Sequence, residues 1–216
     1  MPPPALPSRP PGLPMVVVVL MVLTALPELV LLSADWRLVG SPIWRPLAYQ
    51  YGAFWSGLLR DWQPNYAGQP VLMFVTYGFL HAGPGHLAGN MLVLAPLGGA
   101  VAARVGALRF LAVYAVAMLG GGLGFGLLSN GPAPMVGASG AIFGLTGALV
   151  AWDWRDRREP RRTLAAVLGL VALNVAMWAL MGGQVAWETH LGGAAAGALA
   201  ALGLQGSGRG ASAGTG

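Results

Sequence analysis

Gly137-Ala138-Ser139-Gly140 is a small, polar start to an otherwise apolar run that continues to Trp152. Its two glycines flank a single hydroxyl group and allow another backbone to approach closely. A lone serine in a glycine-rich apolar helix is usually a packing residue that bonds back to a carbonyl of its own helix. The stretch gains chemical meaning only if other polar groups of the chain meet it.

The composition indicates which solvent surrounds this run. The 216 residues are 56% hydrophobic and 9% charged, whereas soluble domains carry about 25% charged residues. We therefore expect a multi-pass membrane protein with the lipid bilayer as a partner. The net charge of +5 comes from arginines that lie between apolar runs, which argues against a nucleic-acid partner. The chain has no cysteine, which excludes disulfides, thiolate metal sites and cysteine nucleophiles.

Six apolar segments are long enough, or nearly so, to cross a bilayer, which takes about 20 residues. They cover residues 15–32, 86–103, 107–128, 137–152, 164–182 and 187–204. The sequence thus predicts an all-α, six-helix membrane domain over residues 15–204. The proline-rich N-terminus (1–14) and the Gly/Ser/Ala-rich tail (205–216) are expected to be disordered.

Arginines in the connecting segments predict the orientation by the positive-inside rule. Nine fall on one side of the membrane, and three (Arg37, Arg45 and Arg60) fall on the other, in the long segment 33–80. Both termini are therefore expected in the cytoplasm. The segment 33–80 is external and holds half of the eight tryptophans. We expect it to form short amphipathic helices in the outer interface rather than a solvent-exposed linker.

All three histidines lie at the external ends of predicted spans, where ionisable residues are candidates for function. His86 and Asn90 open the second span four residues apart, so they share one helix face. Both can donate hydrogen bonds from side-chain nitrogens. His190 opens the sixth span, and His81 precedes the second.

Small residues suggest how the last span meets the fourth. Gly193 and Gly197 follow His190 on its own helix face. The fourth span carries a matching stripe of Gly140, Gly144 and Gly147. If the two stripes pack together, His190 and Ser139 meet at a similar depth as a candidate base and nucleophile.

Each of these features also has a more ordinary interpretation. A histidine near a helix end is more often structural than catalytic, and His86 with Asn90 alone could form an interhelical hydrogen bond. Three histidines could instead hold a metal ion. However, no acidic residue flanks His81 or His86, and Glu188 lies on a different helix face from His190. We therefore expect no metal.

A small transporter is the alternative from another class of protein. The two halves of the chain show no repeat, and no charge is expected at mid-membrane, which disfavours this alternative. Glu28 is the one carboxylate well within a predicted span. Because it follows Pro27, it indicates a local kink or the external end of that span.

Together, three motifs resemble those of the rhomboid intramembrane serine proteases. They are His81-x4-His86-x3-Asn90, then Gly137-x-Ser139-Gly140, then His190-x2-Gly193-x3-Gly197, each at the start of a span. The resemblance covers roughly residues 70–204. It implies a rhomboid-like six-helix bundle with a long external loop between its first two helices.

The resemblance also implies a role for each residue of the motifs. Ser139 would be the nucleophile and His190 the general base of a dyad that forms an acyl-enzyme. His86, Asn90 and the backbone N–H of Ser139 would donate to the oxyanion. Supporting roles would fall to Phe143, which stacks on the catalytic histidine, to His81, which ties the long loop to the bundle, and to Gly137, Gly140, Gly193 and Gly197.

The implied activity is cleavage of transmembrane segments, in single-span or other membrane proteins, near the outer face of a bacterial inner membrane, without a cofactor. The alternative within the same family is a catalytically silent protein that binds client transmembrane helices. The sequence departs from the family pattern in two ways: Leu72 and Met73 replace a frequent Trp-Arg pair, and Ala102 replaces a frequent acidic residue. These departures concern how the loop is anchored, not the dyad.

Overall fold

The computed structural model describes residues 12–157, 159–180 and 185–204, and this part of the chain is mostly helical and has no sheet. Its long helices are α1 (Met15–Asp35), α4 (Pro84–Val105), α5 (Ala107–Leu128), α6 (Ser139–Arg157), α7 (Pro160–Leu180) and α8 (Trp187–Gly203). The segment between α1 and α4 contains α2 (Trp44–Gly52), η1 (Ser56–Leu59), α3 (Gln69–Thr76) and η2 (Tyr77–Phe79).

The helices follow the predicted apolar segments closely. α1, α4 and α5 are each long and apolar enough to cross a bilayer, and the chain is an integral membrane protein. α6, α7 and α8 lie over the other three predicted segments, and the count of six spans remains a prediction. α1 continues past Pro27 to Asp35. The two termini expected to be disordered fall largely on residues 1–11 and 205–216, which lie outside the described residues.

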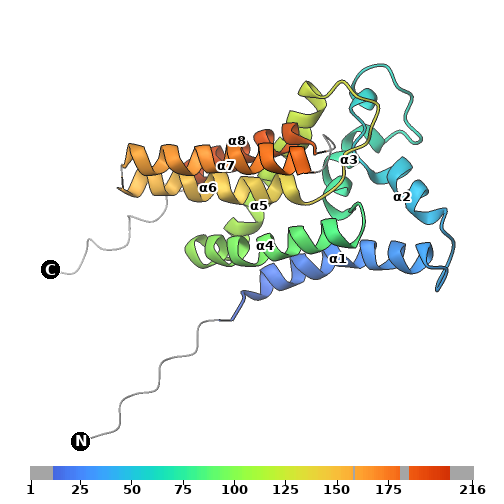
Figure 1. The fold of residues 1–216 in the computed structure, drawn as a ribbon, viewed down its shortest axis with the longest axis horizontal. Coiled ribbons are helices and arrows are strands. Elements are labelled where there is room, and N and C mark those ends of the chain that lie inside the picture. The colour runs from blue at the N-terminus through green and yellow to red at the C-terminus, as the bar shows by residue number, and fades with distance from the viewer. Residues whose placement is uncertain (1–11, 158, 181–184, 205–216) are drawn as a thin grey trace, which may run out of the picture.

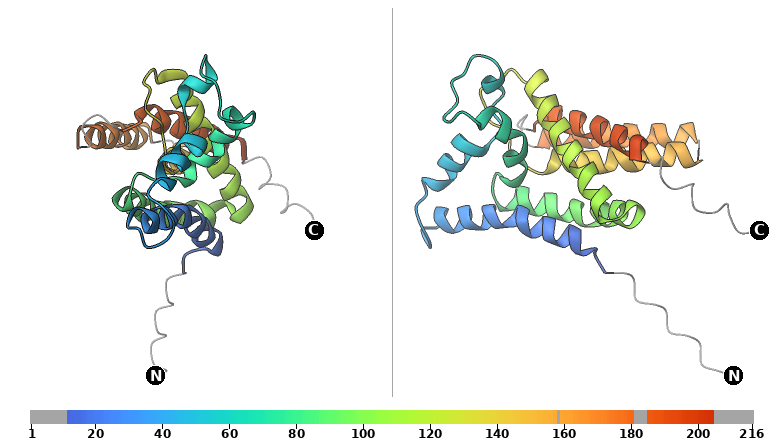
Figure 2. Two further views of the ribbon diagram at one scale, coloured as in Figure 1. Left: turned by 90° about the vertical axis from the view of Figure 1, so that its right-hand side faces the viewer. Right: turned by 180° about the vertical axis from the view of Figure 1, so that it is seen from behind.

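The long helices form two layers with α5 between them. Figure 1 shows α6, α7 and α8 side by side in one layer and α1 with α4 in the other, and α5 crosses between them at a steep angle (Figures 1 and 2). α4, α6 and α8 all begin at the same end of the bundle, beside α2 and α3. We call this end the loop end. It brings the starts of the three motifs together.

α6 and α8 pack so closely that their backbones touch. A Cβ atom added at Gly193 would overlap the carbonyl oxygen of Gly140, and one at Gly197 would overlap that of Gly144. Only residues without a side chain allow this approach. The contact fixes the register of the two helices, and with it the relative depth of their first residues.

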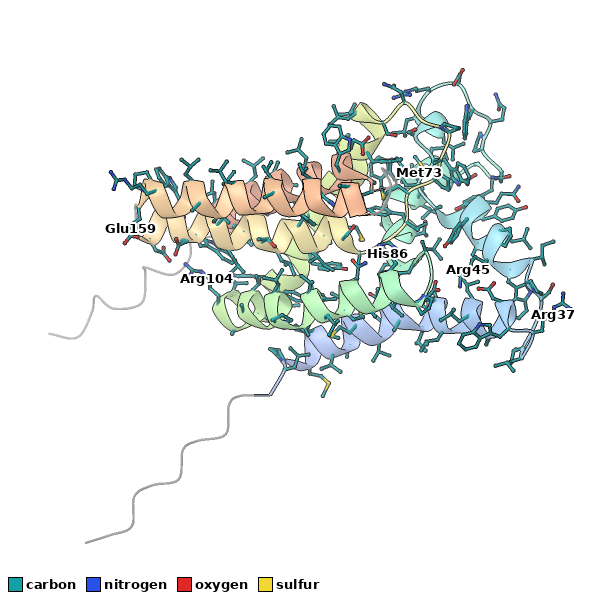
Figure 3. The ribbon with its side chains drawn as sticks, viewed as in Figure 1. Arg37, Arg45, Met73, His86, Arg104 and Glu159 are labelled. Carbon is teal, nitrogen blue, oxygen red and sulfur yellow. The ribbon has the colours of Figure 1, made fainter. Side chains whose placement is uncertain are left out.

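Polar contacts hold the opposite end of the bundle. Arg104, near the end of α4, forms an ion pair with Asp156 of α6 and lies 4.8 Å from the ring centroid of Trp152. The indole nitrogen of Trp152 donates a hydrogen bond of 2.9 Å to the carbonyl oxygen of Ala201 in α8. Figure 3 shows Arg104 at the end of the bundle far from His86.

Candidate active site

Ser139 and His190 meet at the loop end. Ser139 is the first residue of α6, and His190 lies in the first turn of α8. The packing of these helices places His190 Nε2 2.9 Å from Ser139 Oγ. His190 is only 3% exposed. With its proton on Nδ1, the imidazole accepts the serine hydroxyl hydrogen at Nε2.

Phe143 holds the plane of the His190 ring. It follows Ser139 by one helical turn, and its ring stacks on the imidazole with centroids 4.1 Å apart and planes 4° from parallel. The stack restricts rotation of the imidazole about its side-chain bonds. The nitrogen that faces Ser139 is therefore held in place by packing as well as by its hydrogen bond.

His86 turns a hydrogen-bond donor toward the segment that leads into α6. The backbone N–H of Ala82 donates to His86 Nδ1 over 3.2 Å. Because Nδ1 accepts, the ring proton lies on Nε2. A Cβ atom added at Gly137 would lie 2.9 Å from this nitrogen. In Figure 3, His86 lies at the start of α4 and faces this segment.

Asn90 lies one turn further along α4 and is 7% exposed. Its side-chain nitrogen donates a 2.8 Å hydrogen bond to the carbonyl oxygen of His86. An amide group carries two N–H hydrogens, so this bond leaves a second donor for another acceptor. His86 and Asn90 thus lie on one face of α4, and His86 lies beside the segment that leads into α6.

The segment before Ser139 is held by contacts that the sequence motifs do not contain. Gly137 has a φ of +123°, and its N–H donates to the carbonyl oxygen of Tyr77 at 2.9 Å. The hydroxyl of Tyr77 in turn donates to the carbonyl oxygen of Met118 in α5 at 2.7 Å. Sequence analysis missed this role, because a tyrosine in an aromatic-rich segment gives no signal of its own.

An isolated β-bridge adds a second attachment for the same segment. The N–H of Phe54, just after α2, donates to the carbonyl oxygen of Met135 at 3.0 Å, and the N–H of Met135 donates back at 2.9 Å. The long loop and the approach to Ser139 are therefore joined directly. Phe54 is fully buried and packs edgewise on Phe74, Tyr77 and Phe125.

His81 contacts the loop through its backbone rather than through its ring. Its carbonyl oxygen accepts hydrogen bonds from Arg45 Nη1 at 3.0 Å and from the Tyr49 hydroxyl at 2.6 Å. Its ring is fully buried and packs edgewise on His86, with centroids 5.1 Å apart. Burial lowers the pKa of His81 to about 4, so its imidazole is neutral at physiological pH.

Arg45 is the second residue whose contacts the sequence did not reveal. From the sequence it is only one of three arginines in the external segment, yet it forms an ion pair with Glu28 of α1. The hydrogen bonds that Arg45 donates to Glu28 raise the pKa of Arg45 further above its ordinary range. A signal existed: the carboxylate inside an apolar run needs a cation, and this loop supplies one.

An apolar groove lies along the same helices. Its volume is about 610 Å³, and it runs between α6, α7 and α8 toward the His190 ring. Its lining includes Phe143, Val150, Trp154, Leu164, Val167, Val171, His190 and Leu202. Among the described residues, no three His, Asp or Glu side chains cluster as a metal site.

Comparison with known proteins decides the family. The family model described as the Rhomboid domain matches residues 68–206, which contain all three motifs. The chain belongs to the rhomboid family.

Several relatives support the assignment of this chain to the rhomboid family. It is 37% identical over 128 residues to Rhomboid protease GluP of Bacillus subtilis, a match that covers 58% of this chain and 25% of that protein. It is 36% identical over 135 residues to an uncharacterized protein of Mycobacterium tuberculosis, covering 56% of this chain and 54% of the relative. RHOMBOID-like protein 5 of Arabidopsis thaliana is 34% identical over 123 residues, 55% of this chain and 39% of that protein. The rhomboid chain thus spans between a quarter and about half of these relatives.

Proposed function

We propose that this rhomboid chain is an intramembrane serine endopeptidase. The observation that carries the proposal is the 2.9 Å contact between Ser139 Oγ and His190 Nε2. A serine hydroxyl is a weak nucleophile until an adjacent neutral base takes its proton. His190 is within reach to act as that base, and its ring is already held by Phe143.

The reaction has two steps that use the same residues. As Ser139 Oγ attacks the scissile carbonyl, its proton passes to His190, which then gives a proton to the leaving amine. Water next attacks the acyl-enzyme with His190 again as base, and His190 returns the proton to Ser139 Oγ as the bond to the acyl carbon breaks and the carboxylic acid product leaves. Each attack puts negative charge on the carbonyl oxygen, and His86, Asn90 and the N–H of Ser139 are the proposed donors to it.

The surroundings of the dyad favour a membrane-protein substrate. The apolar groove between α6, α7 and α8 ends at His190 and offers an apolar segment a path to the site. A membrane helix hides its carbonyls in internal hydrogen bonds. We therefore propose substrates, single-span or otherwise, whose transmembrane segments contain glycine, proline or polar residues that let them unwind.

The proposed setting is the bacterial inner membrane. The long helices would cross the bilayer six times, with both termini in the cytoplasm and the loop end facing outward. This orientation would put Ser139 near the outer surface, where water can reach the acyl-enzyme. The start of α1 and the end of α8 lie at the same end of the bundle (Figure 1). An even number of spans would give this arrangement.

The proposal is tested with purified protein in liposomes and a substrate whose span contains glycine and proline. Ser139→Ala is expected to abolish cleavage while leaving thermal unfolding in detergent unchanged. Ser33→Ala is the matched control, because the Ser33 hydroxyl bonds only to the Val30 carbonyl of its own helix in this structure. It should cleave at the wild-type rate.

A fluorophosphonate probe separates the enzyme from the catalytically silent alternative. An active dyad should become labelled at Ser139, and Ser139→Ala should not label. Full cleavage by Ser139→Ala would contradict the assignment of the nucleophile. A folded wild-type protein that neither labels nor cleaves would instead favour a protein that only binds client helices.

A further inference from the structure

A buried ion pair lies beside the proposed site and belongs to none of the three motifs. Glu28 of α1 is fully buried, and its two carboxylate oxygens accept hydrogen bonds from Arg45 Nη1 and Nη2, each at 2.9 Å. A buried carboxylate is costly unless a cation pairs with it in good geometry. The two-bond contact therefore defines the position of the Arg45 guanidinium relative to α1.

The same guanidinium binds a second residue of α1 and the turn before α4. Its Nε donates to Asp35 Oδ2 at 2.7 Å, and its Nη1 donates to the carbonyl oxygen of His81 at 3.0 Å. A guanidinium is planar and rigid, so these contacts cannot vary independently. Arg45 thus joins α1, α2 and the turn before α4, and Figure 3 shows it in the space between α1 and α2.

The turn that Arg45 holds also contacts the proposed oxyanion donor, His86 of α4. Its carbonyl partner, His81, stacks edgewise on His86, and the next residue, Ala82, donates to His86 Nδ1. These two contacts set the position of the His86 ring and the nitrogen that carries its proton. A shift of the His81 carbonyl would move both contacts, and the Nε2–H that faces Gly137 would move with them.

We infer that Arg45, held by Glu28 and Asp35, is a positioning residue for His86. The inference rests on the proposed function, since it concerns the oxyanion donors of that site. Arg45 does not touch the dyad and acts through the carbonyl of His81. Arg45 also anchors the long loop. In the family pattern this loop often carries a Trp-Arg pair, which Leu72 and Met73 replace in this chain.

Fluorophosphonate labelling of the full chain in detergent gives two readouts. The fraction labelled at completion reports how many molecules have a folded site. The rate constant reports oxyanion stabilisation, because the attack puts negative charge on the phosphonyl oxygen. A residue that only supports the fold changes the labelled fraction and the unfolding temperature. A positioning residue changes the rate constant of molecules that still label completely.

The decisive variant removes both charges. Arg45→Gln alone leaves Glu28 buried without a cation, so its unfolding temperature should fall. The double variant Arg45→Gln/Glu28→Gln should recover that stability and label completely, but with a rate constant about ten- to a hundredfold below wild type. Arg45→Lys should be intermediate, because lysine keeps the charge without the planar fork.

Arg60→Gln is the matched control from the same loop. Arg60 Nη2 donates to the carbonyl oxygen of Ser129 at 2.8 Å, at the end of α5 rather than at the turn before α4. This variant should keep the wild-type rate constant. Should the double variant label incompletely, Tyr49→Phe leaves the charges of Arg45 and Glu28 in place. It removes the 2.6 Å bond to the His81 carbonyl and the 3.4 Å bond that the hydroxyl accepts from Arg45 Nη1, and it should slow labelling severalfold.

The outcomes separate the two proposals. A wild-type rate constant in Arg45→Gln/Glu28→Gln, or in a completely labelled Tyr49→Phe, would overturn the positioning role. Equal slowing in Arg60→Gln would overturn it too, because any loss of loop attachment would then have the same effect. A folded wild-type protein that does not label at all would overturn the proposed function, and the role of Arg45 with it.

Discussion

At the scale of single residues, Gly137 meets two constraints at once. Its φ of +123° is one that residues with a side chain rarely adopt, and a Cβ atom there would lie 2.7 Å from Cε1 of His86. Gly137→Ala should therefore displace the proposed oxyanion donor. We expect the turnover number to fall by about 10² or more, measured as cleavage in liposomes.

The control for this variant is Gly131→Ala. Gly131 lies in the same connection between α5 and α6, but a Cβ atom there would meet nothing within 4 Å. Turnover should stay at the wild-type level. Normal activity in Gly137→Ala would show that the ring of His86 can move aside without loss of function.

The Phe143–His190 stack gives a milder prediction at the same scale. An aromatic pair is worth about 0.5–1.5 kcal/mol beyond its buried area, so Phe143→Leu should lower turnover about two- to tenfold. Phe143→Tyr keeps the ring and should remain near wild type. Steady-state kinetics with one substrate would compare the two, and equal rates in both variants would mean that stacking does not orient His190.

At the scale of helices, the contact of α6 with α8 should tolerate no added side chain. Gly197→Ala puts a methyl group into the carbonyl oxygen of Gly144. Overpacking of this kind costs about 1–3 kcal/mol, so thermal unfolding in detergent should begin at a lower temperature and cleavage should fall. Gly203→Ala lies on the same helix in open space and should be neutral. A Gly197→Ala protein as stable as wild type would contradict such close packing.

The sequence predicted the structure best where a single physical effect determines the local arrangement. Apolar runs mark membrane helices because the bilayer core admits little else, so the predicted segments and the helices coincide closely. The glycine stripes of α6 and α8 likewise predict a close approach, and the structure brings Ser139 and His190 together. The Arg45–Glu28 pair was missed, because it joins residues 17 positions apart through the path of a loop. No periodic pattern encodes such a path, and the same holds for the bond from Gly137 to Tyr77.

At the scale of the whole molecule, the proposed orientation can be tested by introducing single cysteines, with no native thiol to remove first. The chain contains no cysteine, so single cysteines report cleanly. Ala107→Cys, at the first residue of α5, should react with an impermeant maleimide only from the cytoplasmic side. Asn130→Cys, between α5 and α6, should react only from outside. The reverse pattern in sealed vesicles would invert the proposed topology, and labelling of both positions from one side would contradict the crossing of α5.

The backbone contact of α6 with α8 has an evolutionary consequence. The distance between Ser139 and His190 depends on two main chains that touch, so the side chains on the outer faces of the two helices carry little of that geometry. The amino acids at those positions can change during evolution without altering that distance. The protein can therefore adapt its lipid-facing surface to a thicker, thinner or differently charged bilayer. The glycines at the contact cannot vary in this way, because any other amino acid adds side-chain atoms between the two main chains. Within one turn of either helix, we therefore expect strong selection against substitution at the contact glycines and weak selection at the neighbouring outward-facing positions.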